Sequence, residues 1–335
     1  MEHDGRSTQP WLSVLVPVYG VERYLEACIE SVCAQADAGV EVVLLDDASS
    51  DRSGQIAALL QARHPRHVHV LRHEDNRGIA ATRNDLLAAA RGRHVWFVDS
   101  DDVLHPGAIA GLRAIIEADA PDLVLCDFSL LRDQQYLRHR LRGEHHRRSH
   151  AAEASAVSRD RDALVAGLLQ GRQLHVWSKI ATREAWQAVR FPEGRYFEDM
   201  AVIPQLVAGI HSWRSVAQPW VGYRQRDGSI LATMDLRKTK DELHALHDLH
   251  AGLVGLPGGL DRDAQAALEY FCLRAFASLA RKLPAGSELE ATCRNEMQAM
   301  FPRGVEPVLR GWSRRGWWFR ASRARRSLAR RGWLQ

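Results

Sequence analysis

The chain has 335 residues, with 45 Lys and Arg against 41 Asp and Glu, so its formal net charge is only +4. Hydrophobic residues make up 46% of the chain and charged residues 26%, which are values of a globular protein and exclude a disordered or collagen-like chain. The length predicts about two domains. The low overall charge argues against a domain built to bind nucleic acid.

The cysteine count and the N-terminus indicate where the protein works. There are five cysteines, an odd number, and no CxxC pair, which argues against a disulfide framework or a thiolate zinc site. The first ten residues lack the apolar stretch of a signal peptide. No run of about 18 apolar residues occurs that could cross a membrane. We therefore expect a protein of the reducing cytoplasm.

Apolar runs alternate with helical patterns over roughly the first 130 residues. Strands are expected at Leu12–Val18, Val40–Leu45, His67–Leu71, His94–Val98 and Asp122–Cys126. Helices are expected at 21–32, 51–60, 79–90 and 106–116. This alternation predicts an α/β fold with a mostly parallel sheet flanked by helices. Leu, Ala and His dominate from Asp235 onward, which indicates a helical C-terminal extension.

Three of the expected strands end in polar residues: Pro17 to Tyr19, Asp46-Asp47, and Asp99 to Asp102. Ligands of such sheets bind beyond the carboxyl ends of the strands. Two carboxylates one residue apart can reach the same Mg²⁺ or Mn²⁺, which prefers oxygen ligands. Alternatively, these acidic loops only cap the helices that follow them.

A glycine turn opens the helix expected after the third strand. Gly78 in Asn76-Arg77-Gly78 permits close approach of a backbone, and Arg83 could meet a phosphate or a base edge. Alone, the segment is only a turn followed by a basic helix. Asp47 could likewise accept a bond from a base or ribose, or it could serve in capping with Ser49 to Asp51.

Taken together and in this order, these motifs resemble the N-terminal half of the family 2 glycosyltransferases, which have the GT-A (Rossmann-like) fold. The resemblance is strong over about residues 12 to 127 and thinner to about 232. It implies a nucleotide-sugar donor, a divalent metal ion (Mn²⁺ or Mg²⁺), and transfer with inversion at the anomeric carbon. A nucleotide-dependent oxidoreductase is disfavoured because no GxGxxG follows the first strand.

The resemblance also implies roles for individual residues. Asp47 would hold the base, and Asp99 and Asp101 would bind the metal. The other residues implied in donor binding by this half are Pro17, Tyr19, Gly78, Arg83 and Ser100.

The second half should supply the catalytic base. Phe191 to Asp199 resembles the family's Glu-Asp motif near the acceptor, so Asp199 is implied as the base that takes the acceptor proton, with Glu198 as its rival. The alternative is that both acids merely begin the helix 200–207, where negative charge is favourable.

Two further segments resemble family elements. Lys179 in Trp177-Ser-Lys179 could touch a donor phosphate or only a surface carboxylate. Arg224, Arg226 and Ser229 lie in a late loop that could contact the diphosphate, although a plain turn explains Asp227-Gly228 equally well. The His-rich stretch 132–150 is interpreted as a solvated basic loop rather than a metal site.

The last 33 residues differ from the rest of the chain. Residues 303–335 hold ten arginines and one glutamate, a net charge of +9, and four of the ten tryptophans. Arginine with tryptophan suits an anionic bilayer surface, and Trp317, Ala321, Ala324 and Leu328 share one helical face. The alternatives are that the tryptophans pack on the catalytic domain, or that the tail binds RNA.

We therefore expect a catalytic domain at 1–234, a helical region at 235–302 and a basic tail at 303–335. The predicted function is metal-dependent inverting transfer of a sugar, from a UDP-sugar on family grounds, to a lipid-linked or surface glycan acceptor. The expected location is the cytoplasmic face of the inner membrane. The alternative from another class is a scaffold that binds nucleotide sugars without transferring them.

Overall fold

A computed structural model describes residues 9–132, 145–151, 156–225 and 235–334 of the chain. Its centre is one sheet of eight strands in the order β3-β2-β1-β4-β7-β6-β8-β5. The strands are β1 Leu12–Val18, β2 Val40–Asp46, β3 Val68–Arg72, β4 His94–Phe97, β5 Val103–Leu104, β6 Leu123–Leu131, β7 Lys179–Thr182 and β8 Trp213–Arg224.

The N-terminal part of the sheet is parallel, as predicted. Strands β3, β2, β1 and β4 are parallel neighbours, while β7 lies antiparallel between β4 and β6. The five strands expected from apolar runs are all present, with ends shifted by at most a few residues except for β6, which continues to Leu131. Strands β5, β7 and β8 were not predicted, because the first two are only two and four residues long and β8 is largely half-buried or exposed.

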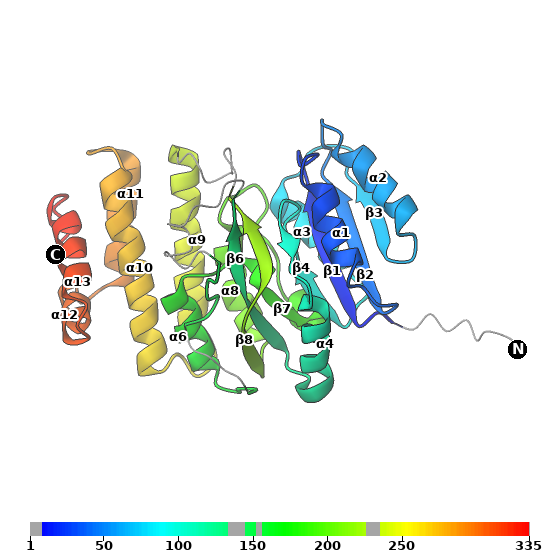
Figure 1. The fold of residues 1–335 in the computed structure, drawn as a ribbon. Coiled ribbons are helices and arrows are strands. Elements are labelled where there is room, and N and C mark those ends of the chain that lie inside the picture. The colour runs from blue at the N-terminus through cyan, green and yellow to red at the C-terminus, as the bar shows by residue number, and fades with distance from the viewer. Residues whose placement is uncertain (1–8, 133–144, 152–155, 226–234, 335) are drawn as a thin grey trace, which may run out of the picture.

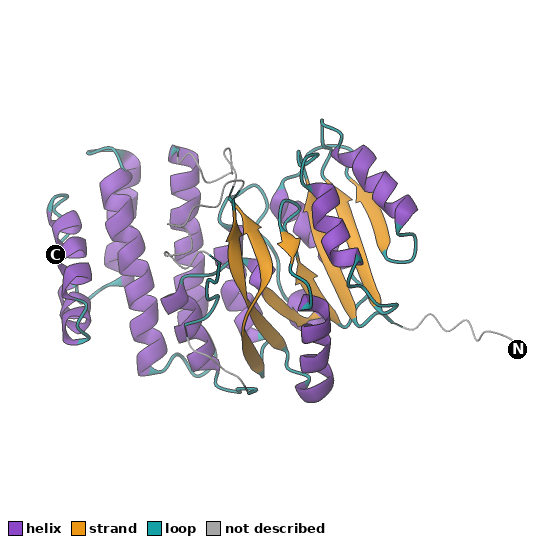
Figure 2. Ribbon diagram, in the orientation of Figure 1, coloured by secondary structure: helices purple, strands orange, loops and turns teal. Residues whose placement is uncertain are grey.

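Helices cover both faces of the sheet (Figure 2). Those that follow the strands are α1 Leu25–Cys33, α2 Ser53–Arg63, α3 Ile79–Ala89, α4 Ala108–Asp119, α6 Arg161–Gly171, η1 Val176–Ser178, α7 Arg183–Gln187 and α8 Glu198–Ala208. Successive residues of a strand point to opposite faces, so Trp96 and Phe97 of β4 enter two different hydrophobic cores. The central strands β1, β2 and β4 are therefore buried on both sides, and polar residues follow their carboxyl ends.

The C-terminal helices extend away from the sheet (Figure 1). They are α9 Leu236–Val254, α10 Arg262–Lys282, α11 Glu288–Met300, α12 Glu306–Arg314 and α13 Trp318–Ala329. Asp235, Asp261 and Ser287 cap α9, α10 and α11 by accepting bonds from backbone N–H groups of the first turn. Helix α9 packs on α8, and α13 packs on α10 and α12, so the basic tail closes this helical region.

The apolar face predicted for the tail points inward. Ala321, Ala324 and Leu328 are buried, so this side of α13 covers other helices and is not available to a membrane. The expected alternative, packing on the catalytic domain, is also imprecise, because the partners of α13 are α10 and α12. The large apolar side chains that α13 exposes are instead Trp318 (67%) and Phe319 (91%). None of the described helices is long and apolar enough to cross a membrane.

Candidate active site at the strand ends

The polar strand ends predicted from the sequence meet at one edge of the sheet. Since β2, β1 and β4 are parallel neighbours, Asp47, Tyr19 and Asp99 all leave the sheet from the same side. Tyr19 is 54% exposed there, whereas Pro17 is buried within β1. Ser100, between the acids after β4, is also buried.

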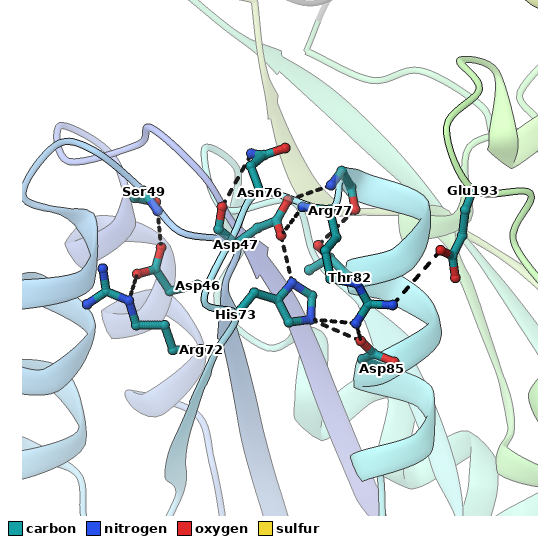
Figure 3. A network of polar contacts seen from close by, with 11 residues as sticks. Asp46, Asp47, Ser49, Arg72, His73, Asn76, Arg77, Thr82, Asp85 and Glu193 are labelled. Atoms are coloured by element: carbon teal, nitrogen blue, oxygen red, sulfur yellow. Dashed lines mark hydrogen bonds and ion pairs between the residues drawn. The ribbon is translucent and has the colours of Figure 1, made fainter.

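The side chain of Asp47 lies at the centre of a polar network (Figure 3). Its Oδ1 accepts bonds from His73 Nδ1 at 2.6 Å and from the backbone N–H of Arg77 at 2.9 Å. Its Oδ2 accepts one from the backbone N–H of Gly78 at 2.8 Å. The other ring nitrogen of His73 lies 2.9 Å from Asp85 Oδ2.

Gly78 is needed for its backbone conformation. Its φ of 82° lies in the left-handed region, where a side chain is strained, and a Cβ at this position would meet no atom within 4 Å. The space in front of Gly78 is therefore open for a ligand, as the sequence suggested.

The acids on either side of Asp47 accept hydrogen bonds from backbone N–H groups between β2 and the first residue of α2. Asp46 Oδ1 accepts a bond from Ser49 N at 3.0 Å, and Asp51 Oδ1 accepts one from Ser53 N at 3.0 Å. Helix α2 thus begins at Ser53, two residues later than expected. Of the residues 49–51 expected to cap the helix, Asp51 bonds to the first residue of α2, whereas the N-cap residue Arg52 makes no side-chain cap bond and Asp47 takes no part.

Arg83 joins the two halves of the site. Its guanidinium donates to Asp99 Oδ1 at 3.2 Å, to Glu198 Oε1 at 2.8 Å and to Asp199 Oδ1. The side chain is only 4% exposed, and its guanidinium lies against the rings of both Phe97 and Phe191. The residue predicted beside the nucleotide thus holds the candidate metal ligand and both candidate bases in one cluster.

The burial of this cluster shifts its proton equilibria. Burial, together with the neighbouring charge of Asp199, raises the pKa of Glu198 to about 7. Burial also raises the pKa of Asp99 to about 6, against the lowering effect of Arg83. Burial lowers the pKa of Arg83, but its three carboxylate partners outweigh this, so its pKa is raised overall. A carboxyl group with a pKa near 7 is suited to exchange a proton at neutral pH.

Glu198 and Asp199 are in the first turn of α8, so the helix-start alternative is also correct as a description. Phe197 precedes them in the left-handed region, with φ 61° and ψ 29°. Asn84 of α3 exchanges two bonds with the backbone of Phe191, at 3.0 and 2.9 Å, and so ties this segment to the first half of the site.

The loop after β4 is held by the last strand of the sheet. Arg224 donates its backbone N–H to Asp102 Oδ1 at 2.7 Å and its Nε to the carbonyl oxygen of Asp101 at 2.9 Å. Arg224 was predicted as a diphosphate contact, and the structure places it against this acidic loop. Arg226 and Ser229, predicted with it, lie outside the described residues.

The residues after β4 fit a divalent cation in their chemistry. Asp99 and Asp101 offer hard oxygen ligands, and burial and the charges of Asp99 and Asp101 raise the pKa of Asp102 well above its usual range. Asp102 Oδ2 is buried without a hydrogen-bond partner. Among the described residues, no three His, Cys, Asp or Glu side chains converge as a complete metal site, so a cation here would need ligands from the substrate as well.

Lys179 lies apart from this cluster. It is fully buried, and its Nζ donates to the carbonyl oxygens of Gln173 at 2.9 Å and of His175 at 2.7 Å. A surface carboxylate, one of the two partners expected for it, is therefore not its partner. Its burial also gives no support to a contact with donor phosphate.

The His-rich segment is less solvated than expected. His146 Nε2 lies 2.7 Å from Asp127 Oδ2, and His150 is buried with its ring against Trp213. His139 lies outside the described residues.

Sequence reasoning missed His73 and Asp85, which surround Asp47. A signal was present, because β3 is the parallel neighbour of β2 and its end must lie beside Asp47. In the sequence Asp102 is distinguished only as part of an acidic run, since its contact with Arg224 depends on a strand that was not predicted.

Comparison with known proteins agrees with this architecture. Residues 13–167 match the model of glycosyl transferase family 2. The chain is 37% identical over 119 residues to the uncharacterized glycosyltransferase EpsJ of Bacillus subtilis, covering 36% of this chain and 34% of EpsJ. It is 26% identical over 243 residues to the glycosyltransferase GlyG of Streptococcus pneumoniae, covering 69% of this chain and 76% of GlyG. The match thus spans only about a third of the length of EpsJ.

The solved structure of S. aureus TarS 1–349 in complex with UDP-GlcNAc superposes with a TM-score of 0.71 at 19% identity, covering 96% of this chain and 92% of that one. This similarity confirms the predicted GT-A fold. The chain thus carries a glycosyl transferase family 2 domain at residues 13–167, which it shares with these named glycosyltransferases.

Proposed function

We propose that the protein transfers a sugar from a nucleotide-sugar donor to an acceptor hydroxyl with inversion at the anomeric carbon. The observation that carries the proposal is the Arg83 cluster. It places the acid at the end of a donor-side strand, Asp99, and the acids that begin α8, Glu198 and Asp199, on one guanidinium. A donor-binding edge and a candidate base thus lie within one side chain's reach of each other.

In this mechanism Asp199 accepts the proton of the attacking acceptor hydroxyl. Its Oδ2 also accepts a bond from Val176 N at 3.2 Å, so its carboxylate is oriented from two sides. Glu198, with its pKa raised to about 7, is the neighbouring group that can share the proton. Arg83 keeps these acids together while they change charge.

Asp99 and Asp101 are the proposed ligands of a Mn²⁺ or Mg²⁺ ion, with the acidic loop held in place by Arg224. Such a cation, when bound, neutralises charge on the diphosphate leaving group. With the metal bound at these residues, EDTA stops turnover and added Mn²⁺ restores it. Full activity in chelator would remove the metal from the proposal.

The donor we propose is a UDP-sugar. TarS, whose fold the chain shares, was solved in complex with UDP-GlcNAc, and this supports the choice of nucleotide but not of the sugar. Asp47 is proposed to receive the base, with Gly78 leaving space for it and Tyr19 exposed beside it. The Asp47 carboxylate is fixed by hydrogen bonds from His73 and from the backbone of Arg77 and Gly78, as expected for a group that recognises a ligand rigidly.

The proposed acceptor is a lipid-linked or surface glycan, and the partner surface is an anionic membrane. Trp318 and Phe319 are exposed at the start of α13, and the same segment of the chain carries the exposed side chains of Arg314, Arg315, Arg320, Arg323 and Arg326. Aromatic side chains among arginines suit the headgroup layer of an anionic bilayer. This set differs from the helical stripe inferred from the sequence, and it supports a position at the cytoplasmic face of the inner membrane.

We further propose a division of work along the chain. Residues 1–234 carry out transfer, 235–302 form a helical support, and 303–335 face the membrane. The last described strand of the sheet ends at Arg224, and the helices that follow pack on the catalytic part as well as on one another, with α9 against α8 and α10 against α6.

A donor screen tests the main proposal. The purified protein is incubated with a panel of nucleotide sugars and Mn²⁺, and released nucleotide is measured, with Asp101→Asn as the control. Release from one donor class that Asp101→Asn abolishes is the expected result. Binding of a nucleotide sugar with no turnover on any acceptor would favour the scaffold alternative instead.

A further inference from the structure

We propose that His73, held in turn by Asp85, is a positioning residue that sets which nucleotide base Asp47 accepts. The inference rests on the proposed donor-binding role of Asp47. It depends on how many hydrogen-bond acceptor positions of the Asp47 carboxylate remain available to a ligand. The bonds that occupy the other positions are drawn in Figure 3.

An ionised carboxylate has about four acceptor positions, two on each oxygen. Both positions of Asp47 Oδ1 are taken, one by His73 Nδ1 at 2.6 Å and one by Arg77 N at 2.9 Å. One position of Oδ2 is taken by Gly78 N at 2.8 Å. The described structure therefore leaves a single acceptor position on this carboxylate, on Oδ2.

His73 and Asp85, which we call the clamp on Asp47, are held in place by burial and by further hydrogen bonds. His73 is 11% exposed in its side chain, and Asp47 is 4% exposed. The far ring nitrogen of His73 faces Asp85 Oδ2 at 2.9 Å, and Arg77 Nη1 donates to the same oxygen at 2.5 Å. Contacts at both ring nitrogens hold the ring between the two carboxylates, so Asp85 and Arg77 help to fix the ring that contacts Asp47.

One free acceptor position selects among bases by the number of donors they present. The imide edge of uracil offers a single N–H between two carbonyl groups, which one acceptor satisfies. Guanine offers two adjacent donors, N1–H and the 2-amino group, which need both oxygens of a carboxylate. Because Oδ1 is occupied by His73 and Arg77, one guanine donor would be left unpaired in a largely buried site, and this costs binding energy.

The test compares the affinity of purified protein variants for UDP and for GDP by calorimetry. His73→Phe fills the space without donating a bond, whereas His73→Asn keeps a donor near the position of Nδ1. The control is His69→Phe on β3, the strand that precedes His73, since His69 contacts Arg91 and has no contact with Asp47 or Asp85 among its hydrogen bonds. Thermal melts accompany each variant to show that it is folded.

Wild-type protein and the His69→Phe control should prefer UDP. His73→Phe should narrow the UDP-over-GDP ratio on the order of tenfold, as one hydrogen bond can account for, and His73→Asn should restore most of it. Asp85→Asn should narrow the ratio less, because it acts through His73. A His73→Phe variant that folds and keeps the wild-type ratio, or that loses UDP and GDP equally, overturns the inference.

Asp47→Asn separates this inference from the proposed function. If Asp47→Asn loses UDP while His73→Phe keeps the ratio, only the positioning role of His73 is wrong. If Asp47→Asn binds UDP as well as the wild type does, or if the wild type binds neither nucleotide, the donor site itself is misplaced and both proposals fall.

Discussion

Arginine is used in opposite ways at the two ends of this molecule. At the strand ends, one arginine, Arg83, is 4% exposed in its side chain and bonds to three carboxylates. In the basic tail, arginines outnumber acids ten to one. In the described structure three of those ten pair with a carboxylate, namely Arg315, Arg325 and Arg331.

The buried Arg83 and the exposed arginines of the tail differ in where their charge is neutralised. A buried cation must be neutralised within the protein, since an unpaired charge there is strongly destabilising. Exposed arginines without acidic neighbours carry no such requirement and stay available to an external anion. The charge of Arg83 is thus balanced within the protein, whereas the exposed arginines of α13 leave their charge facing the solvent.

The largest effect is expected where the internal cluster does chemistry. Asp199→Asn removes the proposed base, so the transfer rate should fall by roughly 10²- to 10⁴-fold while donor affinity stays nearly unchanged. Rate assays and UDP titrations on the same preparation measure both. Glu198→Gln is the matched control at the adjacent position and should cost less. Equal losses of affinity and rate in Asp199→Asn would instead indicate a structural role.

The next effect concerns the stability that Arg83 supplies. Arg83→Met keeps a side chain packed against Phe97 and Phe191 but leaves three carboxylates without their cation, so the free energy of unfolding should drop by about 3–5 kcal/mol. Urea denaturation measures it. The exposed Arg323→Met serves as comparison and should change stability little. If Arg83→Met and Arg323→Met lower the free energy of unfolding by similar amounts, buried and exposed arginines do not differ in their contribution to stability.

A smaller effect is expected from the aromatic pair on α13. Trp318→Ser together with Phe319→Ser should weaken binding to anionic vesicles several-fold in sedimentation assays, because exposed apolar area is lost. Deleting residues 303–335 is a poorer test, since it would remove the buried Trp312 and Leu328 from the helical core. The exposed Leu59 of α2, changed to Ser, is the control. Unaltered binding of the double variant would refute the membrane contact.

The smallest effect follows from the pKa of Lys179, which burial lowers from 10.5 to about 7. Between these values the unfolded chain binds a proton that the folded chain lacks, so the contribution of Lys179 to stability rises with pH. From pH 7 to 9 the melting temperature of the wild type should therefore rise relative to Lys179→Met. Lys282→Met, on an exposed side chain, should follow the wild type. If the melting temperatures of the wild type and of Lys179→Met change with pH in the same way, the pKa of Lys179 is not lowered.

Much of the site could be predicted from local patterns alone. Strands β1, β2 and β4 are buried and mostly apolar, β3 has a recognisable alternating pattern, and parallel pairing brings the ends of such strands together. For this reason the amino-acid sequence is sufficient to place Asp47 and Asp99 at one edge of the sheet.

The features of the site that could not be predicted from the sequence depend on contacts between distant segments. The partners of Arg83 lie 115 and 116 residues further along the chain, and no local pattern records such a distance. The tail's small residues Ala321 and Ala324 do mark one face of α13, but periodicity cannot tell a face that packs on α10 from one that meets lipid. His73 was missed because its role appears only when β3 is laid beside β2.

Strand β7 has a consequence for any attempt to isolate the family domain. The family match ends at residue 167, yet β7, at Lys179–Thr182, is the strand that joins β4 to β6 in the sheet. A fragment that stops at 167 lacks both β7 and β8, so β4, β6 and β5 would lose these neighbours and expose unpaired backbone edges to other chains. The segment that sequence similarity defines is therefore shorter than the unit that folds, and expression of residues 13–167 alone should yield aggregates.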